Sequence, residues 1–159
     1  MKILVSGGNG FLSRGLIVPL AEAGHELRLM DVKSFETEHE CMVGDVAKLE
    51  DAREAVEGMD AVIVAHMAPR EPNAYATPEL CFDINVKGTT NLLFAAAEAG
   101  IRNAVVISSG ASIQAYETQS HTLPGNRPKG LYGLTKSCQE LIAEFYANEH
   151  DFNMGVLRI

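Results

Sequence analysis

The stretch VSGGNGFLSRG, residues 5–15, decides the fold. It follows a short run rich in β-branched residues, KILVS at 2–6, and opens an apolar segment of helix length. Gly7 and Gly10 hold a G-x-x-G spacing, and Ser13 stands where a third glycine is expected. Between a strand and a helix, such glycines permit a tight turn and let backbone N–H groups approach a pyrophosphate. The stretch therefore predicts a dinucleotide-binding turn.

Apolar runs of strand length alternate with helix-length segments along the rest of the chain. Strands are expected at residues 2–6, 26–31, 40–45, 60–68, 103–109 and 153–159, and helices at 11–24, 48–58, 77–100 and 131–150. This alternation predicts one α/β domain over residues 1–159, a doubly wound parallel (Rossmann) sheet of about six strands with helices on both faces. The long irregular segment at 109–130 is expected to be functional, because loops of that length are uncommon in compact domains.

Asp31 ends the second expected strand, about twenty residues beyond the glycine turn. A carboxylate at this place accepts hydrogen bonds from an adenosine ribose, and its charge would repel a 2′-phosphate. NAD is therefore expected as the cofactor in preference to NADP, although Lys33 nearby weakens that preference slightly. The alternative is that Asp31 is only a polar residue at a strand end.

Tyr132 and Lys136 lie four residues apart in GLYGLTKSCQELIAEF, residues 130–145. Positions i and i+4 are neighbours on a helix, and an ammonium beside a phenol favours the phenolate that a general acid/base needs. The alternative is two polar residues on a solvated face. At about 100° per residue, the core-forming stripe is expected to lie nearly opposite this pair. Its members would be Leu134, Cys138, Leu141 and Phe145. The pair would then face either solvent or a cleft.

The composition argues against several classes of partner. The chain carries 13 Lys and Arg against 21 Asp and Glu, a formal net charge of −8, with no basic cluster, so nucleic acid is not expected to bind. The apolar runs are too short to span a bilayer and the N-terminus does not resemble a signal peptide, so a cytoplasmic protein with no membrane partner is expected. Cys41, Cys81 and Cys138 fit neither a disulfide framework nor a zinc site, and no metal site is expected.

Several motifs occur in the order of a known family. They are SGGNGFLS (6–13), GDV (44–46), HMA (66–68), NVKGTTNLLFAA (85–96), and VVISS (105–109) followed by YGLTK (132–136). In this combination the chain resembles the extended short-chain dehydrogenase/reductase family, also called the NAD-dependent epimerase/dehydratase family, over essentially its whole length. The resemblance implies an NAD-dependent oxidoreductase or epimerase core that acts on a sugar, sugar acid or nucleotide sugar.

The resemblance also implies roles for individual residues. Tyr132 would relay a proton to or from a substrate oxygen, Lys136 would assist it and bond the nicotinamide ribose, and Ser109 would orient the substrate oxygen. Ser108, one position earlier, is the alternative to Ser109. The residues expected to bind the cofactor are Gly7, Gly10, Phe11, Leu12, Asp31, Asp45, Val46, His66, Ala68, Asn85 and Lys136. His66 and His121 could also serve as extra acids or ligands, but a structural role is expected for each.

Within the family, RPKGLYGLTKSCQE (127–140) and SSGASIQAY (108–116) look most like the uronate dehydrogenases, which oxidise sugar acids with NAD. Family members continue with a C-terminal region that forms most of the substrate pocket, and that region is expected to be absent from residues 1–159. The chain could therefore be an inactive N-terminal fragment of a longer enzyme, a short enzyme completed by a partner subunit, or a non-catalytic NAD(P)-binding or regulatory module. A homodimer that pairs the helices at 77–100 and 131–150 is also expected.

Overall fold

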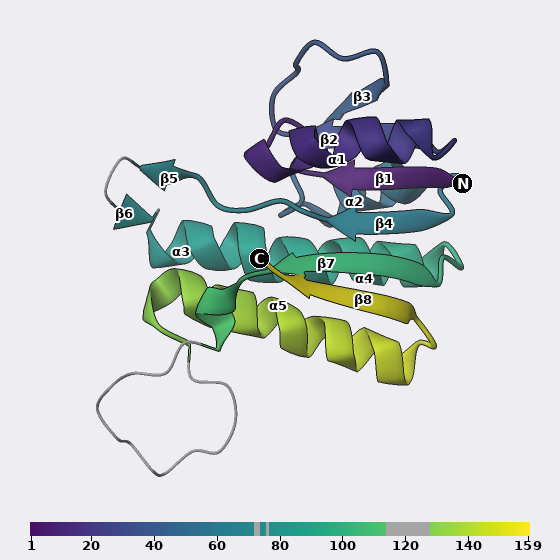
Figure 1. Ribbon diagram of the computed structural model, residues 1–159. Helices are drawn as coiled ribbons and strands as arrows, with labels where there is room; N and C mark the ends of the chain where they lie inside the picture. Colours follow the sequence, from purple (N-terminus) through teal and green to yellow (C-terminus); the bar gives the residue numbers. More distant parts are fainter. Residues whose placement is uncertain (72–73, 76, 114–127) are drawn as a thin grey trace.

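Six parallel strands form the central sheet of the computed structural model, which describes the whole chain except residues 72–73, 76 and 114–127 (Figure 1). The strands are β1 (Lys2–Ser6), β2 (Glu26–Asp31), β3 (Glu40–Val43), β4 (Ala61–Val64), β7 (Asn103–Ser108) and β8 (Asn153–Arg158). They lie in the order β3-β2-β1-β4-β7-β8, which reverses direction between β1 and β4. The predicted doubly wound parallel sheet is confirmed. A separate antiparallel pair consists of β5 (Arg70–Glu71) and β6 (Ala74–Tyr75).

Helices cover both faces of this sheet, because its central strands are apolar on both sides. On one face, α1 (Phe11–Glu22) packs through Leu16 and Leu20 on the side chains of β1, β2 and β4. On the other face lie α2 (Leu49–Val56), α4 (Gly88–Glu98) and α5 (Gly130–Glu149). Within the described residues, no helix is both long enough and apolar enough to cross a membrane.

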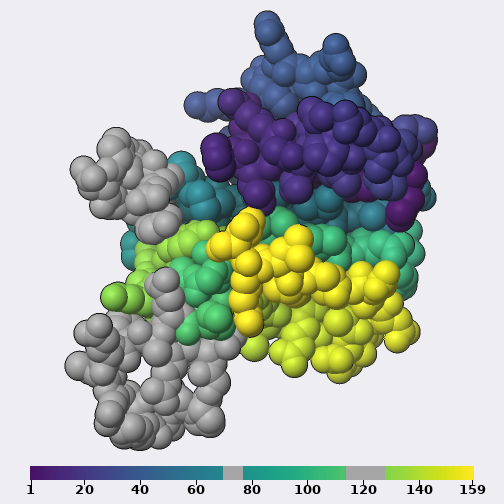
Figure 2. Space-filling view, viewed as in Figure 1, coloured from purple at the N-terminus to yellow at the C-terminus, as the bar shows by residue number. Residues whose placement is uncertain are grey.

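Strand β8 forms one edge of the sheet. Helix α1 covers one face of β1, β2 and β4, and on the same face β8 is exposed to solvent. Leu157 and Ile159 are 54% and 68% exposed. Figure 2 shows the end of the chain, in yellow, at the surface beside α1, in purple. The described part of the chain therefore leaves apolar surface on this end of the sheet.

The segment at 77–100, predicted as one helix, consists of three pieces. Thr77 caps α3 (Pro78–Cys81) by accepting a hydrogen bond from the Leu80 N–H at 3.3 Å, and a π-helix (Phe82–Lys87) connects α3 to α4. The π-helix carries Asn85, which is 1% exposed. Single π turns are frequent at functional sites, and the 3.6-residue periodicity of the sequence does not reveal them.

Helix α5 buries a different face from the one predicted. The stripe expected to form the core is largely exposed, with Leu141 at 63% and Phe145 at 53%. The buried face is instead rich in polar residues, including Thr135, Lys136 and Gln139. The prediction was wrong because these polar groups find partners inside the molecule, so their burial leaves few of them unsatisfied.

The predicted irregular segment at 109–130 begins with a 3₁₀ turn (Gly110–Ser112). Residues 114–127 of that segment, His121 among them, lie outside the described residues.

Two helical glycines provide a test of this packing. A Cβ at Gly88 in α4 would come within 2.6 Å of Val46 Cγ2, whereas a Cβ at Gly15 in α1 would meet no atom within 4 Å. Alanine gains about 1 kcal/mol of helix propensity at either place. We therefore expect Gly15→Ala to raise the free energy of unfolding by up to about 1 kcal/mol, and Gly88→Ala to lower it by about 1–3 kcal/mol through overpacking. Urea unfolding measures both, and shifts of the same sign would contradict the packing of α4.

Candidate functional site

A cavity of about 580 Å³ opens at the carboxyl ends of the strands, where the strand order reverses. In doubly wound sheets, ligands bind in the crevice at this switch point. The glycine turn and Asp31 line one side of the cavity, and Ser108, Tyr132 and Lys136 line it as well. Residues far apart in the sequence are therefore gathered around one space.

The glycine turn forms a backbone cradle at the start of α1. Gly7 has a φ of +70°, and a Cβ there would come within 2.7 Å of the His66 Cα, so only glycine fits without strain. Gly10 is the N-cap of α1 and supplies no side-chain cap, and the first turn contains no acidic residue. The N–H groups of Gly8 and Gly10 are donated to the Met30 and Gly7 carbonyl oxygens, so the groups left for an anion such as a pyrophosphate are the N–H groups that begin α1.

Asp31 is tied directly to this turn. Its Oδ2 accepts a hydrogen bond from the Asn9 N–H at 3.1 Å, and the Asn9 side chain accepts one from Arg14 Nη2 at 2.7 Å. Ser13, in the place of the third glycine, is fully buried, and its hydroxyl has no partner among the described residues. The start of α1 therefore holds a buried serine at this position, with its hydroxyl unsatisfied.

His66 lines the cavity and belongs to a polar cluster in its wall. Its Nδ1 is 2.8 Å from Ser6 Oγ, its Nε2 is 3.4 Å from Thr89 Oγ1, and its side chain is 5% exposed. Burial, with a smaller contribution from the nearby charge of Lys136, lowers the pKa of His66 to about 3. At neutral pH the imidazole is therefore uncharged, with one ring nitrogen as a hydrogen-bond donor and the other as an acceptor.

Asn85 and Ala68 support the wall without lining the cavity. Asn85 Oδ1 accepts a hydrogen bond from the Ala68 N–H at 2.8 Å, and its Nδ2 donates to Thr135 Oγ1 at 2.9 Å. Thr135 in turn donates to the Tyr132 carbonyl oxygen at 3.1 Å. Asn85 thus connects the loop after β4 to the first turns of α5.

Lys136 lies near the Tyr132 ring, as two residues four positions apart on a helix can. Lys136 Nζ is 5.9 Å from the centroid of the Tyr132 ring and donates a hydrogen bond to the Ile107 carbonyl oxygen at 2.8 Å. Lys136 is only 3% exposed, and burial lowers its pKa to about 8. A lysine with this pKa is mostly protonated at neutral pH and loses its proton when the pH rises above about 8.

Of the two candidate serines, the structure brings only Ser108 to the cavity. Ser109 is half-buried, its Oγ donates to the Ile159 carbonyl oxygen at 3.3 Å, and it accepts from the Ala111 N–H at 3.3 Å. Of the residues expected to hold the cofactor, all line the cavity except Ala68 and Asn85, as described above.

The apolar part of the cavity wall was not predicted from the sequence. These residues follow or flank the fingerprint positions, and they include Met30, Ala65, Met67, Leu80, Ile84 and Ile107. Most of these residues lie next to strand ends, and that position could have predicted them as part of the cavity wall. Ile84 could not have been predicted in this way, because it lies in the π-helix.

The fold and the cavity define a Rossmann-type dinucleotide-binding domain with a buried lysine beside a tyrosine. The chain belongs to the NAD dependent epimerase/dehydratase family, whose model matches residues 3–159. The predicted resemblance to this family is therefore confirmed.

Several relatives share the fold and part of the sequence. The 3-beta-hydroxysteroid dehydrogenase of Mycolicibacterium neoaurum is 33% identical, over 98% of this chain and 45% of its own length, and the uronate dehydrogenase of Pseudomonas syringae pv. tomato is 28% identical, over 99% and 58%. Among solved structures, a short-chain dehydrogenase/reductase superfamily protein from Agrobacterium tumefaciens with bound NAD superposes with a TM-score of 0.82 at 30% identity, covering 99% of this chain and 48% of that one. The chain thus spans about half the length of these relatives.

The buried imidazole predicts a pH dependence of stability. Because folding lowers the pKa of His66 from 6.5 to about 3, the unfolded chain binds a proton between these values that the folded chain does not bind. Stability should therefore fall as the pH falls through this window, by roughly 3 kcal/mol from His66 alone between pH 6.5 and pH 4. Urea unfolding of the wild type and of His66→Gln at several pH values measures the difference. Parallel pH profiles for the two proteins would contradict the burial of a neutral imidazole.

Proposed function

We propose that this chain is the cofactor-binding and catalytic part of an NAD-dependent oxidoreductase that acts on the alcohol carbon of a sugar or sugar derivative. One observation carries the proposal: Tyr132 and Lys136 line the same cavity as the glycine turn and Asp31. If Tyr132 and Lys136 were only polar residues on a solvated face, they would not be expected to line the same cavity as the glycine turn. Family membership supports the same conclusion.

The cofactor would lie across the carboxyl ends of the strands. Gly7, Gly10 and the N–H groups that begin α1 would hold the pyrophosphate, and Asp31 would accept hydrogen bonds from the adenosine ribose. Asp45 and Val46, after β3, would contact the adenine side. When bound, the nicotinamide ring supplies the acceptor or donor of a hydride.

Tyr132 would exchange a proton with the substrate oxygen as hydride moves to or from the carbon that bears it. Lys136 supports this step because its buried ammonium stabilises the negative charge that the phenol acquires. We assign the substrate-orienting hydroxyl to Ser108 in preference to Ser109, since Ser108 lines the cavity and Ser109 does not. His66 is uncharged at neutral pH, and we assign the proton transfer to Tyr132 and not to His66.

The names of the relatives narrow the substrate class. The glucuronic acid dehydrogenase of Chromohalobacter salexigens superposes with a TM-score of 0.84 at 28% identity, and a relative in Haloferax volcanii is an NAD-dependent glucose-6-phosphate dehydrogenase at 27% identity. Together with the uronate dehydrogenase, these relatives favour a sugar or sugar acid. The apolar part of the cavity wall and the hydroxysteroid dehydrogenase relative make a 3β-hydroxysteroid the necessary comparison substrate.

A homodimer through α4 and α5 remains part of the proposal. Phe94, Leu141 and Phe145 on these two helices are 40%, 63% and 53% exposed, which is apolar surface that such a dimer would bury. Sedimentation velocity at several protein concentrations measures the assembly, and a monomer at all of them would remove the dimer from the proposal. The cytoplasmic location stays a prediction of the sequence.

Removing one hydroxyl tests the catalytic assignment. Tyr132→Phe deletes the proton donor and keeps the ring, so kcat should fall by about 100-fold or more, while the Kd for NAD should change by less than about threefold. Steady-state oxidation of a uronate, glucose 6-phosphate and a 3β-hydroxysteroid measures kcat, and calorimetry measures NAD binding. Equal losses of turnover and of NAD affinity would contradict the assigned role. NAD binding by the wild type without any turnover would favour a non-catalytic module.

Removing the carboxylate of Asp31 tests the assignment of NAD as the preferred cofactor. We expect calorimetric titration of the wild type to give a lower Kd for NAD than for NADP, because Asp31 accepts from the ribose and repels a 2′-phosphate. Asp31→Ala should weaken NAD binding by about 1–3 kcal/mol and bring the two Kd values together. An unchanged ratio of the two Kd values would exclude Asp31 as the discriminating residue.

A further inference from the structure

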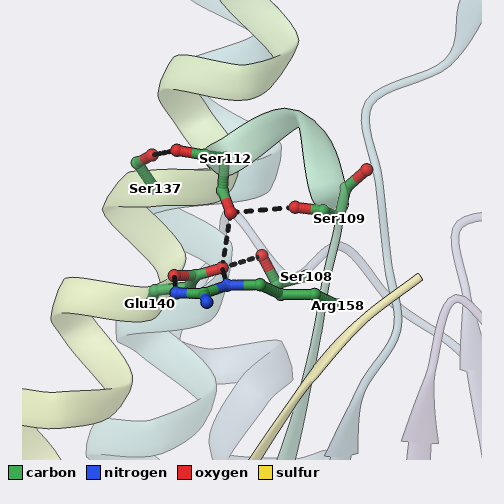
Figure 3. A network of polar contacts seen from close by, with 6 residues as sticks. All are labelled: Ser108, Ser109, Ser112, Ser137, Glu140 and Arg158. Carbon is green, nitrogen blue, oxygen red and sulfur yellow. Dashed lines mark hydrogen bonds and ion pairs between the residues drawn. The ribbon is translucent and has the colours of Figure 1, made fainter. Parts of the chain in front are cut away.

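A buried carboxylate lies directly beneath Ser108. Glu140 on α5 is 8% exposed, and three elements converge on it: β7 through Ser108, the 3₁₀ turn through Ser112, and β8 through Arg158 (Figure 3). Ser108 Oγ donates to Glu140 Oε1, and Ser112 Oγ lies within 2.7 Å of the same oxygen. We call Ser108, Ser112, Glu140 and Arg158 the Glu140 cluster. None of these contacts is explained by cofactor binding.

Arg158 holds the carboxylate in a bidentate ion pair. Its Nε donates to Glu140 Oε1 at 2.9 Å and its Nη2 donates to Oε2 at 2.7 Å. These bonds lower the pKa of Glu140 to about 2, assisted by the hydroxyls of Ser108 and Ser112, and they outweigh the opposing effect of burial. Glu140 is therefore a carboxylate throughout the neutral range, and a carboxylate can only accept hydrogen bonds.

The fold fixes which groups can meet in this cluster. Ser108 and Arg158 are register partners on the parallel strands β7 and β8, so their side chains emerge on the same face of the sheet. Tyr132, Lys136 and Glu140 are spaced four residues apart on α5, so they share one face of the helix. The face that carries the tyrosine and the lysine therefore also carries the carboxylate that holds Ser108.

We propose that Glu140 is a positioning residue. Its carboxylate accepts the one hydrogen bond that the Ser108 hydroxyl can donate, so that the Ser108 oxygen faces the cavity as a hydrogen-bond acceptor. This inference rests on the proposed function, because it concerns the residue assigned to the substrate oxygen. A serine hydroxyl has one proton, and an ionised Glu140 has none to offer, so Ser108 must be the donor between them. The lone pairs of Ser108 then remain for a ligand.

The direction of the hydrogen bond from Ser108 to Glu140 has a consequence for the ligand. An acceptor in the cavity matches a ligand group that donates, such as the hydroxyl of an alcohol. A carbonyl oxygen has no proton to donate and would meet the Ser108 lone pairs unfavourably, unless Ser108 gave up its bond to Glu140. The site is thus arranged to receive the alcohol form of the substrate, the form that is oxidised.

The orientation of the hydroxyl can be measured without any substrate. In the wild type we expect a slowly exchanging hydroxyl proton of Ser108 in proton NMR, assigned by its loss in Ser108→Ala. Glu140→Gln should remove it, since the amide oxygen is drawn to Arg158 and the amide N–H₂ then faces Ser108 as a donor. Glu98→Gln is the matched control, because it breaks a bidentate pair with Arg53 at the surface and should leave the signal in place.

Kinetics test whether Glu140 acts through Ser108. Glu140→Gln should lower kcat for alcohol oxidation by about 10- to 100-fold, with the Kd for NAD within about twofold of the wild type. The double variant Ser108→Ala/Glu140→Gln should be no slower than Ser108→Ala alone, because Glu140 has no further effect once its hydroxyl partner is gone. A double variant slower by the product of the two single effects would overturn the inference, and so would an unchanged kcat in Glu140→Gln.

The two readouts separate this inference from the proposed function. If the wild type binds NAD but oxidises none of the test substrates, the proposed function fails, and the hydroxyl signal alone decides the polarity of Ser108. Its presence in the wild type and loss in Glu140→Gln would support the inference, and its absence from the wild type would overturn it. Should Glu140→Gln fail to fold, Glu140→Asp replaces it: this variant keeps the charge but shortens the reach, and it should also lose the signal.

Discussion

The reversal of strand order between β1 and β4 is the constraint on which the rest of this structure depends. Connections leave these two strands in opposite directions, so a crevice opens between their carboxyl ends. The glycine turn, the loop after β4 and the start of α5 all border that space. Gly7 completes the arrangement because its missing Cβ lets the turn approach the backbone of His66.

The wall of the cavity and the interior next to it contain many buried polar residues. His66, Asn85, Thr89, Lys136, Gln139 and Glu140 are all buried. Leaving a buried polar group without a partner costs about 1–3 kcal/mol, so such a wall is stable only when its members satisfy one another. Most do, as in the bond from Gln139 Nε2 to Thr89 Oγ1 at 2.6 Å. The same burial that requires partners also shifts the pKa values of His66 and Lys136.

The relatives place this chain within a family without giving it a substrate. They include dehydrogenases named for uronates, for glucose 6-phosphate and for hydroxysteroids, and the chain spans about half of their length in most cases. All three are named as dehydrogenases. The hydrogen-bond acceptor proposed at Ser108, which lines the same cavity as Tyr132, would suit an alcohol as the substrate.

The sequence by itself determined the alternation of strands and helices, the glycine turn, Asp31 and the pairing of Tyr132 with Lys136. All of these are local patterns, in which residues a few positions apart are placed by strand, turn or helix geometry alone. Only the tertiary structure decided that Ser108 and not Ser109 reaches the cavity, that the helix at 77–100 contains a π turn, and that α5 buries its polar face. It also brought Glu140 to Ser108 and Arg158, which are 32 and 18 residues away in the chain. The periodicity of the sequence does not reveal these contacts. They arise where α5 packs against β7 and β8, whereas periodicity reports only the geometry within one helix or one strand.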